Sequence, residues 1–569
     1  MIKEKYELWC QKAIGDPDLI SELKEMKGND ELISEAFYKD LEFGTAGLRG
    51  VIGAGTNRLN IYTVGKATQG LASYVNSKTK NGSVAIAYDS RIKSDIFAKI
   101  SAQILAANGI KVYLYKELMP TPMLSFAVRH FKCDAGIVIT ASHNPAKYNG
   151  YKAYGPDGCQ LGPEAAEYVL SIMNKVDTFT GVKTMDFDLA VTKGMIEYIS
   201  CDAINTYLSL VEDTRVSKDL DLSDLKVVYT PLHGAGNKPV RAVLDRIGVK
   251  QLHVVAEQEK PDGNFPTAPY PNPEIRQAFE CALKLAQTVK PDLLLATDPD
   301  SDRVGIAIPN GEEYRLFSGN EVGALLLNYV LSVRYENKTL PENPVAVKTI
   351  VSTEICNKIA QKYGCDLKNV LTGFKFIGEQ VLLLEEIGQE DRFVFGFEES
   401  YGYLSGSFVR DKDAVIASML ICEMTAYYKS KGKNLIEVLN DLYEEFGYYY
   451  SVQKSFTFEG QSGMKHIKSL MAQLHENAPD EIDGKKVNVI KDYETSVSRN
   501  LITGETHTIN LPKSNVVCFE FSDGSSFIVR PSGTEPKIKL YISALGTDDK
   551  TASQKVEELT NAGVKLLGL

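Results

Sequence analysis

SVAIAYD at residues 83–89 and KVYLY at residues 111–115 are two short apolar runs separated by a stretch with helical periodicity, roughly residues 96–108. Short runs rich in β-branched and aromatic residues, bounded by polar residues, are typical of buried strands. The order strand, helix, strand predicts a β-α-β unit, in which two parallel strands are joined by a crossover helix.

Further apolar runs repeat this pattern through the first three quarters of the chain. They are DAGIVIT (134–140), KVVYT (226–230), LHVVA (252–256), DLLLAT (292–297) and RFVFGF (392–397). Strands that alternate with helical stretches indicate an α/β fold with mostly parallel sheets covered by helices. After a tyrosine-rich helix end at residues 447–450, shorter strands and a late helix predict a smaller α+β unit from about residue 451.

Length and charge limit the possible functions. A chain of 569 residues suggests about four domains. The net charge of −11 disfavours nucleic acid and anionic membrane surfaces as partners, so an anionic substrate would need a local cluster of cations and backbone N–H groups. No apolar run reaches the roughly 20 residues that span a bilayer. We therefore expect neither nucleic acid nor membrane as a partner.

The cysteines and the N-terminus predict a cytoplasmic protein. The nine cysteines are scattered without a C-x-x-C pair, which argues against disulfide frameworks and zinc knuckles. We expect these thiols to be reduced and buried. Residues 1–40 alternate charged and apolar residues and lack the uncharged core of a signal peptide.

Polar loops follow three of the predicted strands. In open α/β sheets, ligands bind beyond the carboxyl ends of the strands. TASHNP (140–145), DPDSDR (298–303) and EESYG (398–402) all lie at such positions. This rule marks the three loops as candidate sites.

The loop DPDSDR carries three carboxylates at alternate positions, Asp298, Asp300 and Asp302. Crowded carboxylates repel one another, and all-oxygen ligands favour a hard cation such as Mg²⁺. A calcium EF-hand loop is excluded, because its sixth and twelfth positions hold Arg303 and Pro309 instead of Gly and Glu. A solvated acidic turn is the simpler alternative, but the preceding buried strand favours a metal site.

Two other segments carry polar side chains in tight loops. TASHNP places Ser142 beside His143, yet the chain has no G-x-S-x-G elbow, and by itself the segment is more typical of a capped turn. RPSGTEPK (530–537) combines Arg530, two hydroxyls, a glycine and a lysine, the donors that a phosphate dianion requires. The glycine-rich segments at 50–55 and 234–236 complete no nucleotide-binding motif and are interpreted as turns.

Taken together, TASHNP, DPDSDR, the EES of residues 398–400 and RPSGTEP resemble the four ordered signatures of the α-D-phosphohexomutase family, over nearly the whole chain. The resemblance implies four domains around a central cleft, three related α/β domains and a smaller C-terminal α+β domain. The expected domains are 1–205 with the phosphoserine loop, 206–318 with the metal loop, 319–450 with the sugar-binding loop and 451–569 with the phosphate-binding loop.

The resemblance also implies a role for each motif. Ser142 is expected to be phosphorylated and, with Asp298, Asp300 and Asp302, to hold Mg²⁺. The other expected residues share binding or catalytic roles at the sugar phosphate: Glu398 and Ser400 for sugar hydroxyls; Arg530, Ser532, Gly533 and Thr534 for the non-reacting phosphate; His143, Lys152 and Lys375 for acid-base chemistry; and Arg49 and Arg303 for electrostatic support.

The implied activity is phosphoglucomutase, in which phosphoserine donates to a sugar phosphate and a glucose 1,6-bisphosphate intermediate turns end for end. The second glutamate of EESYG (398–402) resembles phosphoglucomutases more than phosphomannomutases. Pro299 and Ser301 replace glycines often seen in the metal loop, and the pattern resembles a branch that includes phosphopentomutases and a glucose-1,6-bisphosphate synthase. Phosphopentomutase and phosphomannomutase activities therefore stay open.

Two other classes of function compete with a mutase. A serine-dependent phosphatase would pass the phosphoryl group to water, but only seven histidines are spread along the chain and no zinc-ligand cluster is visible. A silent sugar-phosphate-binding protein would not need Ser142 and all three aspartates. We expect a sugar phosphate as partner, and a monomer or weak homodimer.

Overall fold

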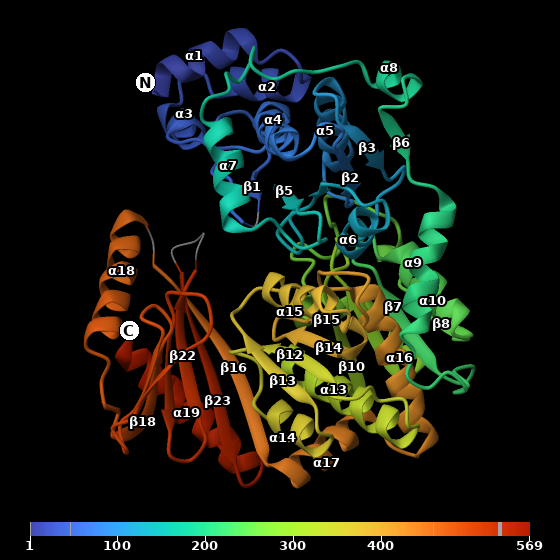
Figure 1. The fold of residues 1–569 in the computed structure, drawn as a ribbon, viewed down its shortest axis with the longest axis vertical. Coiled ribbons are helices and arrows are strands. Elements are labelled where there is room, and N and C mark those ends of the chain that lie inside the picture. Colours follow the sequence, from blue (N-terminus) through green and yellow to red (C-terminus); the bar gives the residue numbers. More distant parts are fainter. Residues whose placement is uncertain (1, 46, 459, 533–536, 569) are drawn as a thin grey trace. The chain divides into compact units, whose positions relative to one another are not determined.

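The computed structural model describes residues 2–45, 47–458, 460–532 and 537–568 (Figure 1). The chain divides into two compact units. The first unit comprises Met1–Phe317, Ile377–Phe393 and Ser400–Ser430. The second unit comprises Ser318–Phe376, Val394–Glu399 and Lys431–Leu569.

The first unit begins with three helices packed around Trp9: α1 (Ile2–Lys12), α2 (Pro17–Glu25) and α3 (Asp30–Phe37). The side chains of Asp16 and Asn29 accept hydrogen bonds from the first turns of α2 and α3. Such caps satisfy backbone N–H groups that a helix leaves unpaired at its N-terminus.

The first sheet contains the predicted β-α-β unit, and its strand order is β1-β5-β4-β2-β3-β6. Its strands are β1 (Leu48–Val51), β2 (Ser83–Tyr88), β3 (Lys111–Leu114), β4 (Ala135–Ile139), β5 (Tyr148–Tyr154) and β6 (Ile196–Tyr198). Its helices are α4 (Ile61–Lys78), α5 (Ser94–Ala107), α6 (Thr121–His130), α7 (Pro163–Met173), α8 (Phe187–Thr192) and α9 (Cys201–Asp213). β2 is parallel to both β3 and β4, whereas β5 returns antiparallel to β4.

The second sheet has the order β11-β10-β9-β7-β8. Its elements are β7 (Lys226–Thr230), α10 (Asn237–Arg246), β8 (Gln251–Val254), α11 (Ala256–Glu259), η1 (Arg276–Phe279), α12 (Glu280–Val289), β9 (Leu293–Thr297), β10 (Val304–Asn310) and β11 (Glu313–Leu316). β7 is parallel to β8 and β9, and β10 runs back antiparallel to β9. The turn from β9 to β10, residues 298–303, carries the three aspartates and is called the aspartate loop below.

The next segment contributes to both units. Its elements are α13 (Gly319–Glu336), β12 (Val345–Thr349), α14 (Ile355–Lys362), β13 (Asp366–Val370), α15 (Lys375–Glu386), η2 (Glu390–Arg392), β14 (Phe393–Glu398), β15 (Gly402–Leu404), α16 (Ala414–Ser430) and α17 (Leu435–Phe446). The strands form one sheet in the order β13-β12-β14-β15, in which β12 pairs with β13 in parallel.

The C-terminal part of the second unit is an antiparallel sheet with the strand order β16-β23-β22-β21-β18-β19-β20, and β17 pairs with β18. Its elements are β16 (Tyr448–Thr457), α18 (Gly460–Glu476), β17 (Glu481–Ile482), β18 (Lys485–Asp492), β19 (Val497–Asn500), β20 (Thr506–Thr508), β21 (Val517–Phe521), β22 (Ser526–Pro531), β23 (Lys537–Gly546) and α19 (Asp549–Leu566). One face packs on α18 and α19 through residues such as Phe519 and Val529, and the helices lie along the sheet in Figure 1. The opposite face carries a second apolar cluster that includes Cys518 and Ile528.

The α/β class and the mixed, mostly parallel sheets of the first three quarters are confirmed. The prediction that residues 447–450 are the end of a helix is wrong. Helix α17 ends at Phe446, and strand β16 begins at Tyr448. All nine cysteines are free, but Cys10 and Cys201 are exposed, so the expectation of burial is wrong for these two. Among the described residues, no helix combines the length and apolar character needed to cross a membrane.

Candidate active site

Ser142 lies in the loop that leaves the buried strand β4, and its backbone is in the left-handed region, with φ of 52°. A non-glycine residue adopts this conformation only where its surroundings hold it. The Ser142 N–H donates to Thr140 Oγ1 at 2.8 Å, and Thr140 Oγ1 donates to Asp89 at 2.7 Å. The loop is therefore fastened to the carboxyl end of the neighbouring strand β2.

Arg91, in the loop after β2, holds the Ser142 loop through four backbone carbonyls. Its guanidinium donates to the carbonyl of Ser142 at 2.5 Å, to Tyr148 at 2.9 Å and to Pro145 at 3.1 Å, and also to Asn144. The Arg91 side chain is buried, and its Nε lies 3.4 Å from an Asp89 carboxylate oxygen. Because the guanidinium is planar and presents its donors in a fixed fork, it restrains several carbonyls at once.

The aspartate loop supplies three buried carboxylates next to Ser142. Ser142 Oγ donates to Asp298 Oδ2 at 2.7 Å. The other Asp298 oxygen accepts from the backbone N–H groups of Asp302 and Arg303 at 3.1 and 3.0 Å. These contacts bring the predicted serine and the first predicted metal aspartate together, although 156 residues separate them in sequence.

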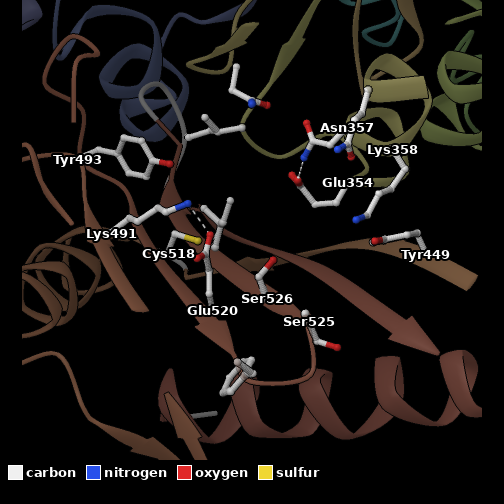
Figure 2. A pocket seen from close by; sticks show the side chains of 16 residues that line it. Glu354, Asn357, Lys358, Tyr449, Lys491, Tyr493, Cys518, Glu520, Ser525 and Ser526 are labelled. Carbon is white, nitrogen blue, oxygen red and sulfur yellow. Dashed lines mark hydrogen bonds and ion pairs between the residues drawn. The ribbon is translucent and has the colours of Figure 1, made fainter. Parts of the chain in front are cut away.

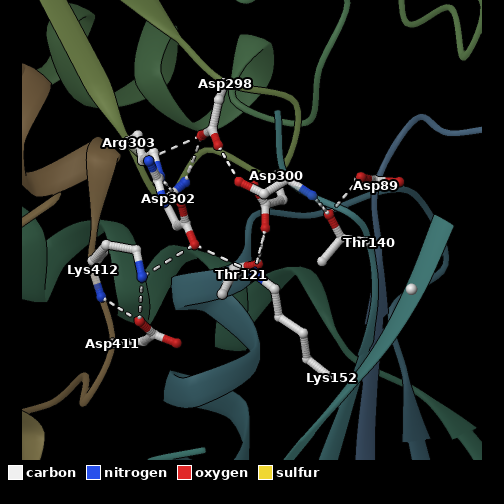
Figure 3. A network of polar contacts seen from close by, with 12 residues as sticks. Asp89, Thr121, Thr140, Lys152, Asp298, Asp300, Asp302, Arg303, Asp411 and Lys412 are labelled. Atoms are coloured by element: carbon white, nitrogen blue, oxygen red, sulfur yellow. Dashed lines mark hydrogen bonds and ion pairs between the residues drawn. The ribbon is translucent and has the colours of Figure 1, made fainter. Parts of the chain in front are cut away.

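Cationic and hydroxyl groups from three other segments approach the remaining aspartates (Figure 3). Lys152, on β5, lies 2.8 Å from Asp300 Oδ2 and 3.3 Å from Asp302 Oδ2. Thr121, at the start of α6, donates to the same Asp300 oxygen at 2.9 Å. Lys412, in the loop before α16, lies 3.5 Å from Asp302 Oδ2.

The carboxylates of Asp298, Asp300 and Asp302 form a group whose ligand oxygens all lie within 4.8 Å of one another. One buried oxygen of Asp300 and one of Asp302 accept no hydrogen bond from any residue that the structure describes. Burial, and then the charges of Asp300 and Asp302, raise the pKa of Asp298 well above its ordinary value. Orphaned buried carboxylate oxygens that repel one another are the donor set that a hard divalent cation requires. The residues therefore fit Mg²⁺.

His143 and Arg303 flank this centre. His143 Nδ1 lies 3.2 Å from Ser142 Oγ. Burial, reinforced by the charges of Arg303 and Arg49, lowers the pKa of His143 well below its ordinary value, so the imidazole is neutral. Arg303 forms an ion pair with Glu274 at 2.7 Å and lies 3.7 Å from an Asp302 oxygen. Arg49 is an exposed residue of β1.

The glycine-rich segment at 234–236 supports the aspartate loop. A Cβ added at Gly234 would lie 2.5 Å from the Pro299 Cα, and one at Gly236 would lie 2.6 Å from the Ser301 Oγ. The Ala235 N–H donates to the Pro299 carbonyl at 2.8 Å. The segment was predicted to be a turn, and its glycines also permit this close backbone approach.

Most of the other predicted site residues belong to the second unit and lie in different elements of it. Glu398 is the buried last residue of β14, Lys375 begins α15 and stacks over the Phe376 ring, and Arg530 lies in β22. Ser532 donates its backbone N–H to the Lys537 carbonyl at 2.8 Å. Ser400 follows β14 and belongs to the first unit. Gly533 and Thr534 lie outside the described residues.

Comparison with known proteins identifies the family. The phosphoglucomutase/phosphomannomutase domain models match in order: alpha/beta/alpha domain I at residues 40–180, domain II at 205–311, domain III at 318–446 and the C-terminal domain at 470–561. A phosphoglucomutase of Staphylococcus aureus (strain MRSA252) is 40% identical over 558 residues, which are 97% of this chain and 98% of that protein. The chain belongs to the phosphoglucomutase/phosphomannomutase family. It is accordingly a phosphotransferase of the isomerase class.

A second curated relative shows the same family, and one solved structure shows the same fold. A phosphoglucomutase of Staphylococcus haemolyticus is 40% identical over 530 residues, 92% of this chain and 93% of that protein. The open form of parafusin, a Paramecium phosphoglucomutase, shares the fold with a TM-score of 0.68 and 17% identity, over 93% of this chain and 96% of that one.

Sequence reasoning missed several residues that this phosphohexomutase brings to the aspartates. Asp89 and Arg91 follow the carboxyl end of β2, so the rule that selected the other loops also pointed to them. Lys412 lies between two aspartates in RDKD (410–413), a local charge alternation that could have been noticed. Thr121 gave no signal, because a threonine at a helix start is ordinarily a capping residue.

Proposed function

We propose that this enzyme is a phosphoglucomutase that interconverts α-D-glucose 1-phosphate and glucose 6-phosphate, with phosphorylated Ser142 as donor and acceptor and glucose 1,6-bisphosphate as intermediate. The observation that carries the proposal is the 2.7 Å hydrogen bond between Ser142 Oγ and Asp298, inside a cluster of three buried carboxylates. The two staphylococcal relatives, both named phosphoglucomutase, favour glucose phosphate over mannose or pentose phosphate.

In this proposal, Asp298, Asp300, Asp302 and an oxygen of phosphorylated Ser142 hold Mg²⁺. When bound, the ion neutralises negative charge on the phosphoryl oxygens during transfer. Arg91 and Thr140 position the serine by fixing its loop, since phosphoryl transfer depends mainly on alignment and charge stabilisation.

The reaction forms and breaks one P–O bond at each transfer. A free sugar hydroxyl attacks the phosphorus of phosphoserine and gives its proton to the acid-base residue proposed at Lys375, while Ser142 Oγ leaves and takes a proton from His143. After the bisphosphate turns round, Ser142 Oγ attacks the other phosphate and gives its proton back to His143, and the leaving sugar oxygen takes up the proton held at Lys375. His143 is suited to accept or return the serine proton at Nδ1, because its imidazole is neutral and lies 3.2 Å from Ser142 Oγ.

Lys152 fits an electrostatic role better than that of a general base. Burial alone would lower the pKa of Lys152, but the charges of Asp300 and Asp302 outweigh it and raise the pKa. The Lys152 ammonium is paired with Asp300 at 2.8 Å and can neutralise charge near the transferred group. Lys375 remains the candidate acid-base residue of the second unit, with Arg49 and Arg303 as electrostatic support.

The family pattern supplies the proposed residues for the rest of the substrate. Glu398 and Ser400 would accept or donate hydrogen bonds to sugar hydroxyls. Arg530, Ser532, Gly533 and Thr534 would bind the phosphate that is not reacting, because a guanidinium and neutral donors match a phosphate dianion. These four residues are called the phosphate clamp, and the same clamp would serve both orientations of the bisphosphate.

Incubation with glucose 1-phosphate, Mg²⁺ and a trace of glucose 1,6-bisphosphate tests the proposal. We expect glucose 6-phosphate, detected by a coupled dehydrogenase assay, and faster turnover than on mannose 1-phosphate or ribose 1-phosphate. Free phosphate in place of glucose 6-phosphate would instead show a phosphatase. Faster turnover of ribose 1-phosphate would show a phosphopentomutase.

A further inference from the structure

A cavity of about 510 Å³ lies within the second unit, between helix α14 and the C-terminal sheet. The helix side contributes Glu354, Asn357 and Lys358, and the sheet side contributes residues such as Lys491 and Ser526 (Figure 2). None of the residues proposed for phosphoryl transfer lines it. Its volume falls in the range of small-molecule sites.

The two walls each contribute a lysine, and only one of these lysines has an ion-pair partner among the described residues. Lys491, on β18, forms an ion pair with Glu520 of β21 at 2.5 Å. Burial would lower the pKa of Lys491, but the neighbouring Cys518 and Glu520 outweigh it, so the ammonium stays charged. Lys358 has no ion-pair or hydrogen-bond partner within the part of the chain that the structure describes. Figure 2 shows both lysines pointing into the space from opposite walls, with Ser526 between them.

The acidic residue on the helix wall is already neutralised. Glu354 accepts from the buried ammonium of Lys348 at 2.9 Å and also from the amide of Asn357. With Glu354 paired to Lys348 and Glu520 paired to Lys491, the charge left without a partner is the positive one of Lys358. An anion is therefore the charged group that this cavity can accept without displacing an existing pair.

The remaining lining groups are suited to hydroxyls. The hydroxyls of Tyr449 and Tyr493 have no hydrogen-bond partner among the described residues, and Gln361 and Asn369 add amide groups. The apolar surface is small and is contributed by residues such as Ile350 and Ile528. Hydroxyl and amide groups around a cation favour a polar ligand with its own hydroxyls over a purely apolar one.

We propose that this cavity is a second ligand site, which binds a small hydroxylated organic anion, with its carboxylate or phosphate between Lys358 and Lys491 and its hydroxyls towards Tyr449, Tyr493 and Ser526. Its lining includes no residue of the proposed phosphoryl-transfer centre. On strand β22 it lies close to the proposed phosphate clamp, because Ser526, Ile528 and Arg530 alternate on one face of the strand.

Hydrogen-deuterium exchange of the full-length enzyme tests this site locally. The probes are citrate and sn-glycerol 3-phosphate, each at up to about 10 mM, ten times a millimolar dissociation constant. We expect slower exchange in peptides that cover residues 354–361 and 518–528. The two probes distinguish a carboxylate from a phosphate ligand. Absence of protection by both probes, or protection by the cation spermidine instead, would overturn the proposal.

Variants separate this site from binding elsewhere. Lys358→Gln should raise the probe concentration needed for half-maximal protection about tenfold. The substitution removes one charge-assisted hydrogen bond between the exposed lysine and the anion. Lys362→Gln, one turn along the same helix and paired with Glu445 outside the cavity, is the matched control and should leave protection unchanged. Arg530→Ala should also retain it. Loss of protection in Arg530→Ala, or equal protection in Lys358→Gln and wild type, would contradict the assignment.

Discussion

Charged side chains are buried around Asp298, Asp300 and Asp302 in the first unit (the aspartate centre). They are partly exposed in the cavity between α14 and the C-terminal sheet of the second unit (the α14 cavity). At the aspartate centre, Asp298 and Asp300 are fully buried, and Lys152 is nearly so. In the cavity, the side chains of Lys491 and Glu520 are each 35% exposed, and Lys358 is an exposed residue. Buried charges interact strongly and require fixed partners, whereas exposed charges are screened and adapt at little cost. The first arrangement suits transition-state stabilisation and the second suits reversible binding.

The largest expected effect comes from removing the hydroxyl at the buried centre. Ser142→Ala should reduce turnover by roughly 10⁴-fold or more, because no other group can carry the phosphoryl group. The coupled assay with glucose 1-phosphate measures it. Ser90→Ala removes another buried serine hydroxyl, which has no hydrogen-bond partner among the described residues, and this control should keep activity. Turnover by a folded Ser142→Ala protein would refute the role of Ser142 as phosphoryl donor and acceptor.

The next effect should come from the charge of one aspartate. Asp300→Asn should lower turnover about 10²–10³-fold and weaken Mg²⁺ binding, because it removes a carboxylate ligand and the partner of Lys152. Magnesium titration of both activity and thermal stability measures the two effects. Asp262→Asn, at a half-buried aspartate of the same unit whose carboxylate accepts from the Asn264 N–H, should change neither. An unchanged magnesium affinity in Asp300→Asn would show that the ion is held elsewhere.

The proposed clamp in the second unit should affect binding more than chemistry. Arg530→Ala should raise KM about 10- to 100-fold, since a charge-assisted pair to phosphate contributes about 1.5–3 kcal/mol. Initial rates over a range of glucose 1-phosphate concentrations separate KM from kcat. Arg499→Ala, on strand β19 of the same sheet, serves as the control. If both constants stayed unchanged in Arg530→Ala, the phosphate would bind elsewhere.

A smaller effect should follow from loosening the Ser142 loop. Arg91→Lys retains a cation beside Asp89 but loses the guanidinium fork that holds four carbonyls. We expect kcat to fall about tenfold with little change in KM, because misalignment of the serine slows the transfer step. Steady-state kinetics on protein whose folding has been checked by circular dichroism provide the measurement. A change in KM alone would assign Arg91 to substrate binding.

The smallest expected effect concerns pH and stability in the second unit. Burial and the neighbouring Glu398 raise the pKa of Glu399 from 4.5 to about 7. Its contribution to stability is therefore fully present below pH 4.5 and is lost as the pH rises through about 7. Thermal unfolding of wild type and Glu399→Gln between pH 5 and 8 tests this. We expect the wild type to lose more stability than the variant, and parallel curves would contradict it.

Local patterns predicted much of the fold. KVVYT at 226–230 was placed without error as β7, and the predicted helix at 96–108 is α5, Ser94–Ala107. The error at residues 447–450 has a physical cause, since tyrosines favour strands and their periodicity does not reveal where a helix ends. The strand orders were not predictable, because pairing depends on contacts between segments far apart in sequence.

The candidate site divides in the same way. The sequence itself singled out Asp298, Asp300 and Asp302 as a metal cluster, because closely spaced carboxylates after a buried strand need a cation. It did not indicate that Arg91 holds the Ser142 loop or that Lys412 approaches Asp302. Nor did it show that Lys152 is an ion-pair partner of the aspartates.

The order of four motifs and the alternation of strands and helices were sufficient to establish the class of fold and the family of this enzyme. Only the tertiary structure decided which cation meets which carboxylate, which carbonyls restrain the serine, and that α14 and the C-terminal sheet enclose a polar cavity. Periodicity and turn chemistry act over a few residues and can be read along the chain. Charge pairing and cavities arise where distant segments pack together, and they depend on distances that the order of residues does not specify.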